Sequence, residues 1–358
     1  MIYHLLFPLR EYISFFNIFR YITLRTGGSA LTALILTLIF IPLYLKKARY
    51  KERISEDVPS RHKKKEGTPS AGGIVFLPVV LLSTLLWAKL NNPFIYLASF
   101  VVIYLGLMGF IDDIKKLTGD KKKGLSKGEK ILLQFILAIV VVISLYYLFP
   151  KEVAFKTQFL FFKNIYINFG LFYLFFVILV FIGTTNAVNL TDGLDGLAAG
   201  AALAPLTVFI LISYFEGNKI LSNYLHLLYI PGIEELTIFG GAFLGALLGF
   251  LWYNAFPADI FMGDTGSQAL GGALGIIAIL TKQEFLLAIA GGLFVIEAIS
   301  VIIQVYYFKK TRGKRIFLKA PLHHHYEEKG FSEPKIVVRM WIISFIFAII
   351  ALATIKIR

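Results

Sequence analysis

The stretch LTIFGGAFLGALLGFLWYNAF, residues 236–256, decides the fold. It holds no charged residue, and it is as long as a helix that crosses the hydrocarbon core of a bilayer. Gly241, Gly245 and Gly249 repeat inside it at a spacing of four residues. Small residues at that spacing allow two membrane helices to approach closely. The stretch therefore predicts a transmembrane helix that packs tightly against a neighbour.

Nine further apolar segments lie on either side of this stretch. Hydrophobic residues make up 57% of the 358-residue chain and charged residues only 16%, whereas soluble domains carry about a quarter charged residues. We expect an all-α, polytopic membrane protein of about ten transmembrane helices, forming a single domain over residues 1–358. The ten segments are 28–45, 72–87, 94–111, 131–149, 169–188, 197–215, 236–256, 266–281, 285–308 and 336–355.

Charge predicts the orientation of these helices. The loops after the first, third and ninth segments are basic, with nine, seven and nine Lys or Arg residues over 46–71, 112–130 and 309–339. Because basic loops stay in the cytoplasm, we expect these three loops inside and both termini outside. The net charge of +14 is accordingly expected to face anionic lipid, with no nucleic-acid partner. The chain has no cysteine, which excludes disulfides and thiolate sites.

Five aspartates are predicted to lie at the cytoplasmic ends of the helices. Asp112 and Asp113 lie in IDDIKK, Asp192 and Asp195 in NLTDGLDG, and Asp264 in FMGDTGS. Ionisable groups at a membrane boundary are costly, so their presence here indicates function rather than solvated loops. Unopposed carboxylates need protons, hydrogen bonds or a cation, and oxygen ligands favour Mg²⁺ held together with substrate phosphates. The sequence therefore predicts a magnesium site.

Basic side chains near these aspartates suit an anionic substrate. Lys116 shares a face with Asp112 if the third helix continues, either as a simple ion pair or as part of the site. His323–His325 in PLHHHYE lack the helical spacing of a zinc site, and we expect them to meet an anionic substrate. Lys63–Lys65 either do the same or form a solvated charge run. Glu297 is the one carboxylate well inside a predicted span, and the sequence assigns it no role.

Four motifs together resemble those of the phospho-N-acetylmuramoyl-pentapeptide transferases, which belong to the polyprenyl-phosphate N-acetylhexosamine-1-phosphate transferases. The motifs are IDDIKK, TTNAVNLTDGLDGL, GFLWYNAFPADIFMGDTGS and PLHHHYEEKG, and the resemblance runs over residues 61–339. It implies a ten-helix homodimer in the bacterial inner (cytoplasmic) membrane, with an active-site cleft on the cytoplasmic side. It also implies a Mg²⁺-dependent transfer of phospho-N-acetylmuramoyl-pentapeptide from its UDP carrier to undecaprenyl phosphate. The products are lipid I, a peptidoglycan precursor, and UMP.

The resemblance also implies roles for individual residues. Asp264 corresponds to the Mg²⁺ ligand, and one of Asp112 and Asp113 to the group proposed to deprotonate the lipid phosphate. Phe261 and Asp195 correspond to the uracil pocket. The catalytic positions are Asp112, Asp113, Asp264 and His323, and the substrate-binding positions are Lys65, Lys116, Asn186, Asn189, Asp192, Asp195, Phe261, His324 and His325. The register of Lys65 within its run of three lysines stays open.

Several alternatives remain at this point. Direct attack by the lipid phosphate is favoured over an aspartyl-phosphate intermediate, because phosphoryl transfer chiefly requires positioning and charge neutralisation. A relative that uses UDP-N-acetylglucosamine is the alternative within the same class of enzyme. A transporter would place ionisable residues near the middle of the membrane, where Glu297 is almost alone. A structural scaffold does not explain the clustered carboxylates.

Overall fold

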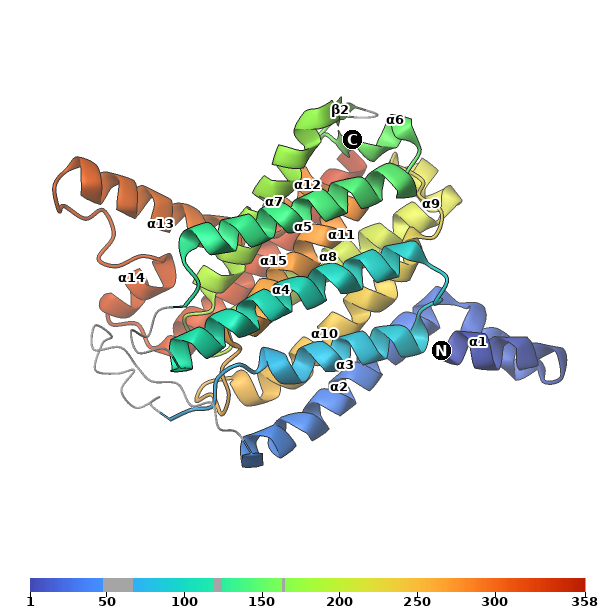
Figure 1. Cartoon of the computed structure of the whole chain (residues 1–358), viewed down its shortest axis with the longest axis horizontal. Helices are drawn as coiled ribbons and strands as arrows, with labels where there is room; N and C mark the ends of the chain where they lie inside the picture. Colours follow the sequence, from blue (N-terminus) through green and yellow to red (C-terminus); the bar gives the residue numbers. More distant parts are fainter. Residues whose placement is uncertain (48–66, 119–123, 163–164, 358) are drawn as a thin grey trace.

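The computed structural model describes residues 1–47, 67–118, 124–162 and 165–357, which form a bundle of long helices with one short hairpin (Figure 1). The predicted all-α architecture of a polytopic membrane protein is confirmed. The α-helices are α1 (Ile2–Leu6), α2 (Ile22–Lys47), α3 (Gly73–Trp87), α4 (Pro93–Thr118), α5 (Lys127–Leu148), α6 (Lys151–Ala154), α7 (Tyr173–Thr191), α8 (Leu197–Gly217), α9 (Lys219–Leu225), α10 (Leu236–Asn254), α11 (Gly263–Leu280), α12 (Glu284–Ala290), α13 (Gly292–Lys310), α14 (Leu322–Glu328) and α15 (Glu333–Ile357). The other elements are the 3₁₀ turns η1 (Phe7–Glu11), η2 (Ser14–Arg20), η4 (Gly170–Phe172) and η5 (Ile233–Glu235), and the antiparallel strands β1 (Lys156–Gln158) and β2 (Tyr166–Asn168).

Every predicted apolar segment coincides with helical structure. Among the described residues, eight helices are long and apolar enough to cross a membrane: α2, α4, α5, α7, α8, α10, α13 and α15. The second predicted segment forms α3, which is apolar but only 15 residues long. The eighth predicted segment forms α11, and α12 precedes α13 within the ninth.

The glycines of 236–256 bring α10 against α2, as their spacing predicts. A Cβ atom at Gly245 would lie 1.9 Å from the carbonyl oxygen of Ala30, and one at Gly249 would lie 2.9 Å from that of Leu34. Ser29 adds a hydrogen bond of 3.1 Å from its hydroxyl to the carbonyl of Ile238. The two backbones therefore touch along a line where no side chain separates them.

Helix α11 lies inside the bundle and is shielded from lipid. Every residue from Asp264 to Leu280 is buried. A Cβ atom at Gly109 of α4 would lie 2.2 Å from the carbonyl oxygen of Asp264, and one at Gly271 would lie 2.6 Å from Cα of Thr185 in α7. Because its neighbours cover it, α11 need not be as apolar as a helix that faces lipid. Its polar first turn is held by close contact with α4.

The two ends of the bundle differ. At one end of the bundle, which we call the site end, α4 ends, α5 begins and α14 lies (Figure 1). The β1–β2 hairpin, α6 and α9 lie at the opposite end, which we call the hairpin end (Figure 1). The amino terminus donates to the carbonyls of Leu85 and Leu86 near the end of α3, at 2.7 and 3.0 Å. Lys356 Nζ lies 3.3 Å from the carbonyl oxygen of Tyr224 in α9. Both termini therefore lie at the hairpin end, as an even number of crossings requires.

The ninth predicted segment, 285–308, is divided rather than continuous. Helix α12 ends at Ala290 and α13 begins at Gly292. Gly291 and Gly292 carry no side chains and favour a break, which hydropathy alone did not indicate. Beyond the break, α13 leans away from the bundle and leads to α14 (Figure 1). The break therefore sets the position of the three histidines.

Candidate active site

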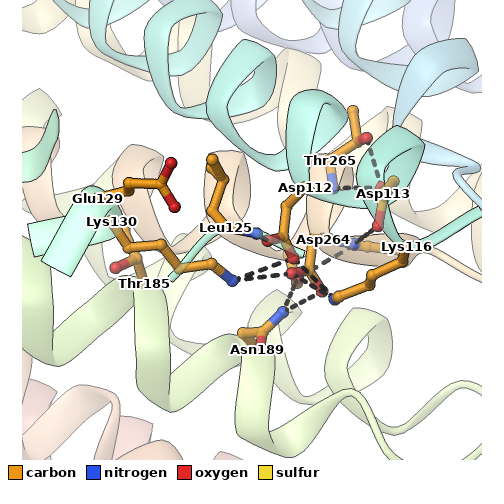
Figure 2. A network of polar contacts seen from close by, with 12 residues as sticks. Asp112, Asp113, Lys116, Leu125, Glu129, Lys130, Thr185, Asn189, Asp264 and Thr265 are labelled. Carbon is orange, nitrogen blue, oxygen red and sulfur yellow. Dashed lines mark hydrogen bonds and ion pairs between the residues drawn. The ribbon is translucent and has the colours of Figure 1, made fainter. Parts of the chain in front are cut away.

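Two aspartates and two lysines from three helices meet at the site end (Figure 2). Asp112 lies near the end of α4, and Asp264 in the first turn of α11. Lys116 Nζ lies 2.8 Å from Oδ2 of each carboxylate, which confirms the expected i,i+4 contact and extends it to a second helix. Lys130 Nζ lies 3.1 Å from Asp112 Oδ2 and 3.2 Å from Asp264 Oδ2. The four formal charges cancel, and the lysines are the more exposed partners.

The start of α5 places Lys130. Ser126 and Glu129 form a capping box, in which the Ser126 hydroxyl accepts from the Glu129 N–H at 3.2 Å and the Glu129 carboxylate accepts from the Ser126 N–H at 2.6 Å. The preceding N–H of Leu125 donates to Asp112 Oδ1. The sequence LSKGEK thereby begins a helix with its last lysine turned toward the carboxylates.

Asp113 holds the beginning of α11. Its Oδ1 accepts the N–H of Asp264 at 3.0 Å. Its Oδ2 accepts the N–H and the hydroxyl of Thr265 at 2.9 and 2.6 Å. These backbone donors would otherwise be unpaired at a helix N-terminus. Asp113 and Asp112 thus have different surroundings, since Asp113 meets neutral donors and Asp112 meets ammonium groups.

Helix α7 adds an amide to this network. Asn189 Nδ2 donates to Asp264 Oδ1 and to Ser267 Oγ, both at 2.9 Å. Asn186, almost one turn earlier, instead donates to the carbonyl of Ile182 in its own helix at 2.8 Å. Of the two predicted asparagines, Asn189 is therefore the one that contacts the carboxylate network.

The connection between α7 and α8 contacts the connection between α10 and α11. Asp192 follows the last residue of α7, and Asp195 lies in the turn before α8. Asp195 Oδ2 accepts the N–H of Ala258 at 3.0 Å. Phe261, near the end of that same connection, is half-buried and accepts the N–H of Gly72 at 2.8 Å through its carbonyl oxygen. Asp195 thus contacts the same connection that carries Phe261.

Two of the three histidines form hydrogen bonds with residues close to them in the sequence. His324 Nδ1 lies 2.6 Å from a carboxylate oxygen of Glu327. Burial lowers the pKa of His324 from its ordinary value of 6.5, and the hydrogen bond to Glu327 opposes that shift. His325 Nδ1 accepts the N–H of Leu318 at 3.1 Å, which ties α14 to the chain that precedes it.

The third histidine, His323, points into the protein. Its side chain is fully buried, and its Nδ1 lies 3.1 Å from Oε2 of Glu297 in α13. On its other side the ring meets Gly193, where a Cβ atom would lie 2.4 Å from Nε2. Glu297 therefore has a partner that sequence reasoning did not find, and His323 connects α13 to the loop after α7.

The structure brings together five of the residues that the sequence singles out. Asp112, Lys116, Asn189 and Asp264 form one network, with Asp113 behind it. Sequence reasoning missed Lys130 and Thr265. Lys130 is one of seven cations in its loop, and the capping-box pattern before it was the signal that could have placed it. Lys65, together with Lys63 and Lys64, lies outside the described residues.

The carboxylate oxygens of Asp112 and Asp264 suit a magnesium ion that substrate phosphates would help to hold. Within the described part of the chain, no group of three or more His, Cys, Asp or Glu side chains is arranged to hold a metal. Mg²⁺ is commonly bound by one or two carboxylates together with water and substrate phosphates. Asp112 and Asp264 present carboxylate oxygens to the same two ammonium groups, so both point at one place.

An apolar cavity of about 300 Å³ lies between α7, α12 and α13. Its lining includes Val188, which precedes Asn189 on α7, and Gly291, at the break between α12 and α13. The cavity follows α7 back to Phe176 and reaches Glu284. A flexible apolar chain suits a cavity of this lining.

Comparisons with known proteins identify the family of the chain. The sequence profile of glycosyl transferase family 4 matches residues 94–282, which include Asp112, Asn189 and Asp264. The chain is 51% identical, over the full length of both proteins, to the phospho-N-acetylmuramoyl-pentapeptide-transferase of Desulfotalea psychrophila. It is 48% identical over the full length to the protein of that name from Thermodesulfovibrio yellowstonii, and 50% identical over 96% of both chains to that from Ruegeria sp.. The chain therefore belongs to the phospho-N-acetylmuramoyl-pentapeptide transferases, within glycosyl transferase family 4.

Proposed function

We propose that the chain transfers phospho-N-acetylmuramoyl-pentapeptide from UDP to undecaprenyl phosphate, giving lipid I and UMP, at the cytoplasmic side of the bacterial inner membrane. The observation that carries this proposal is the adjacency of a charged site and an apolar cavity. Asn189 belongs to the carboxylate network, and Val188 lines the cavity. A polyprenyl phosphate needs a charged site for its phosphate and an apolar cavity for its chain. The activity named for the full-length relatives supports the same conclusion.

The proposed reaction is a direct displacement. An oxygen of undecaprenyl phosphate attacks the sugar-linked phosphorus of the UDP carrier, and the bond from that phosphorus to UMP breaks. Both reactants are anionic, so the site must offset their repulsion. Lys116 and Lys130 are its partly exposed cations, and they meet the phosphate oxygens. Each lysine that turns to a phosphate frees oxygens of Asp112 and Asp264.

Asp264 is the proposed magnesium ligand, and Asp112 is the carboxylate beside it. A bound cation would withdraw charge from the pyrophosphate and make UMP a better leaving group. Asp112 is also better placed than Asp113 to accept a proton from the lipid phosphate. Asp112 faces Lys116 and Lys130, the cations that would meet the phosphates, whereas Asp113 faces the buried first turn of α11.

The proposed sugar is N-acetylmuramoyl-pentapeptide, and the connection that carries α14 contributes to that choice. Lys314 and Arg315 are exposed on this connection, and Lys319 is partly exposed. The peptide arm carries carboxylates that these cations would bind. UDP-N-acetylglucosamine has no such arm and would leave polar groups without partners. We further propose that the enzyme acts as a homodimer, which mass measurement of the purified protein in detergent would test.

The decisive experiment measures UMP release by the purified protein with undecaprenyl phosphate, Mg²⁺ and each UDP-sugar in turn. We expect turnover with UDP-N-acetylmuramoyl-pentapeptide and none with UDP-N-acetylglucosamine. Asp264→Asn should abolish turnover in a folded protein, whereas Glu152→Gln, an exposed carboxylate at the hairpin end, should behave as wild type. Efficient use of UDP-N-acetylglucosamine would replace the proposed substrate. Movement of a solute across liposomes without UMP release would replace the proposed class.

A further inference from the structure

We propose that Glu297 is a positioning residue for His323. Its carboxylate binds Nδ1 of the ring and holds Nε2 at the loop between α7 and α8, as a hydrogen-bonding group for the anionic substrate. The part that concerns the substrate rests on the proposed function. The part that concerns the carboxylate–histidine pair rests on contacts within the chain alone.

The contact between the two residues is buried on both sides. The Glu297 and His323 side chains are 1% and 0% exposed, and Oε2 lies 3.1 Å from Nδ1. A carboxylate oxygen can only accept, so Nδ1 carries the shared proton. This contact selects the tautomer and leaves Nε2 as the free nitrogen of the ring. The same contact fixes the plane in which Nε2 points.

The free nitrogen faces the loop between α7 and α8. Nε2 of His323 is buried and has no hydrogen-bond partner among the described residues. It lies against Gly193, where even a Cβ atom would come within 2.4 Å of it. Gly193 directly follows Asp192, at the end of the helix that carries Asn189. A buried ring nitrogen without a partner is costly. A ligand hydroxyl that donates to Nε2 would satisfy the neutral ring, and an anionic ligand oxygen would accept from Nε2–H once the ring is protonated.

Glu297 has no competing task among the described residues. Its second carboxylate oxygen, Oε1, is buried there without a hydrogen-bond partner. The neighbouring His324 ring lies 4.2 Å from that of His323 between centroids, but its Nδ1 is turned to Glu327. A carboxylate inside a membrane helix is costly, and here its one hydrogen bond is to the histidine. Among the described residues, the Glu297 carboxylate therefore binds only the His323 ring.

The chemical consequence concerns the protonated ring. When His323 takes a second proton, both nitrogens become donors and Nε2–H points at the loop. The Glu297 carboxylate then acts as the counter-ion, and it offsets the cost of burying the imidazolium. A carboxylate on Nδ1 thus holds an imidazole in one tautomer and supports its charged form.

The test compares Glu297→Gln with wild type by two independent readouts. The first is ¹⁵N NMR of histidine-labelled protein in detergent, with the His323 signals identified by their loss in His323→Gln. Wild type should show one tautomer, protonated at Nδ1, and Glu297→Gln should show a mixture. The second is turnover in Glu297→Gln, because a ring that the carboxylate no longer holds presents Nε2 to the loop less often. The maximal kcat should fall about 10- to 100-fold, as is usual for groups that orient a functional histidine.

Ser300→Ala is the matched control on α13. The Ser300 hydroxyl donates to the main-chain carbonyl of Glu297 at 2.6 Å and does not touch its carboxylate. This variant should keep the wild-type tautomer and the wild-type kcat. Glu297→Asp keeps the charge with a shorter side chain, so it should lie between wild type and Glu297→Gln. If Glu297→Gln does not fold, the comparison of Glu297→Asp with Ser300→Ala decides whether Glu297 positions His323.

Combined variants give the sharpest kinetic result. In a His323→Gln background, Glu297→Gln should cause no further loss of kcat, since its effect passes through the ring. Independent losses that multiply would overturn the proposal, and so would an unchanged tautomer in both Glu297 variants. If the muramoyl substrate proves wrong, the NMR comparison still decides whether Glu297 positions His323. Failure of the proposed function and failure of this inference are therefore distinguishable.

Discussion

Asp112 and Asp113 show how adjacent residues acquire different roles. Successive residues on an α-helix point about 100° apart, because one turn takes 3.6 residues. One carboxylate of α4 therefore meets Lys116 and Lys130, while the next meets the first turn of α11. The helix geometry separates a side chain that contacts cations from one that holds the scaffold.

Asp113→Asn should destabilise the protein more than Asp112→Asn does. The new amide group would face donors of Asp264 and Thr265, so buried donors would lose their acceptor. We expect a cost of about 1–3 kcal/mol in the free energy of unfolding. Thermal unfolding of both variants in detergent measures this, with UMP release recorded in parallel. An unchanged unfolding temperature for Asp113→Asn would show that the contact with α11 is not needed.

Lys130→Met should slow turnover by about 10²–10³-fold, the usual cost of removing a preorganised donor that meets developing or repelling charge. Lys127 is the matched control, because it lies on the same first turn of α5 but is exposed. Lys127→Met should leave UMP release near the wild-type rate. Equal rates for the two variants would mean that Lys130 neutralises Asp112 and Asp264 only in the substrate-free protein.

At this scale the sequence identified the acids better than the bases. Asp112 and Asp264 stand out because carboxylates are rare at a membrane boundary, and no Lys or Arg occurs near Asp264 in its loop. Lys130 does not stand out, since it belongs to a loop with seven cations. Only the three-dimensional fold decides which of these cations lies beside the carboxylates. Glu297 was recognised as unusual, but its partner lies 26 residues away on another helix.

At the scale of elements, close backbone contact determines where the site lies. The glycines at 241, 245 and 249 fix α10 on α2, and Gly109 fixes α4 on the beginning of α11. These contacts leave no room for a methyl group, so relative shifts of the helices are restricted. The carboxylates of α4 and α11 are consequently held together by packing as well as by charge.

Gly245→Ala should destabilise the bundle by about 1–3 kcal/mol, because the added methyl group would overlap the carbonyl of Ala30. Gly27→Ala is the control, since the same added methyl group at that position of α2 meets nothing within 4 Å. That variant should be neutral or slightly stabilising, because alanine favours helix. Thermal unfolding of both variants measures the difference. Equal stability would mean that α10 and α2 can separate without cost.

Hydropathy predicted the long helices and missed the interruptions. The long helices could be predicted because a helix that spans the bilayer requires about 20 consecutive apolar residues, and no other element has this requirement. The break at Gly291 lies within an apolar run, so neither the hydrophobic periodicity nor the length of that run indicated it. The β1–β2 hairpin and α9 are too short for a periodic signal, and contacts elsewhere in the chain determine them.

For the whole molecule, the central prediction is orientation. We expect the site end in the cytoplasm, because the basic loops belong to it. Lys329→Cys at the site end should resist an impermeant maleimide in intact spheroplasts, whereas Ile220→Cys at the hairpin end should react. Both positions are exposed, and the natural chain has no cysteine to interfere. Lys121–Lys123 are predicted on the same side as Lys329, although they lie outside the described residues. Reaction of Lys329→Cys from outside would reverse the orientation.

The shared location of the two termini has a practical consequence for immobilisation. A bead or sensor chip that captures the protein through either terminus would hold each molecule with its site end facing the solution. Soluble ligands would then reach the site without passing the support. The two ends of the chain are not equivalent for this purpose, because the ammonium group of Met1 caps two carbonyls of α3. An extension there would remove that charge, so a tag on the carboxyl terminus is the better anchor.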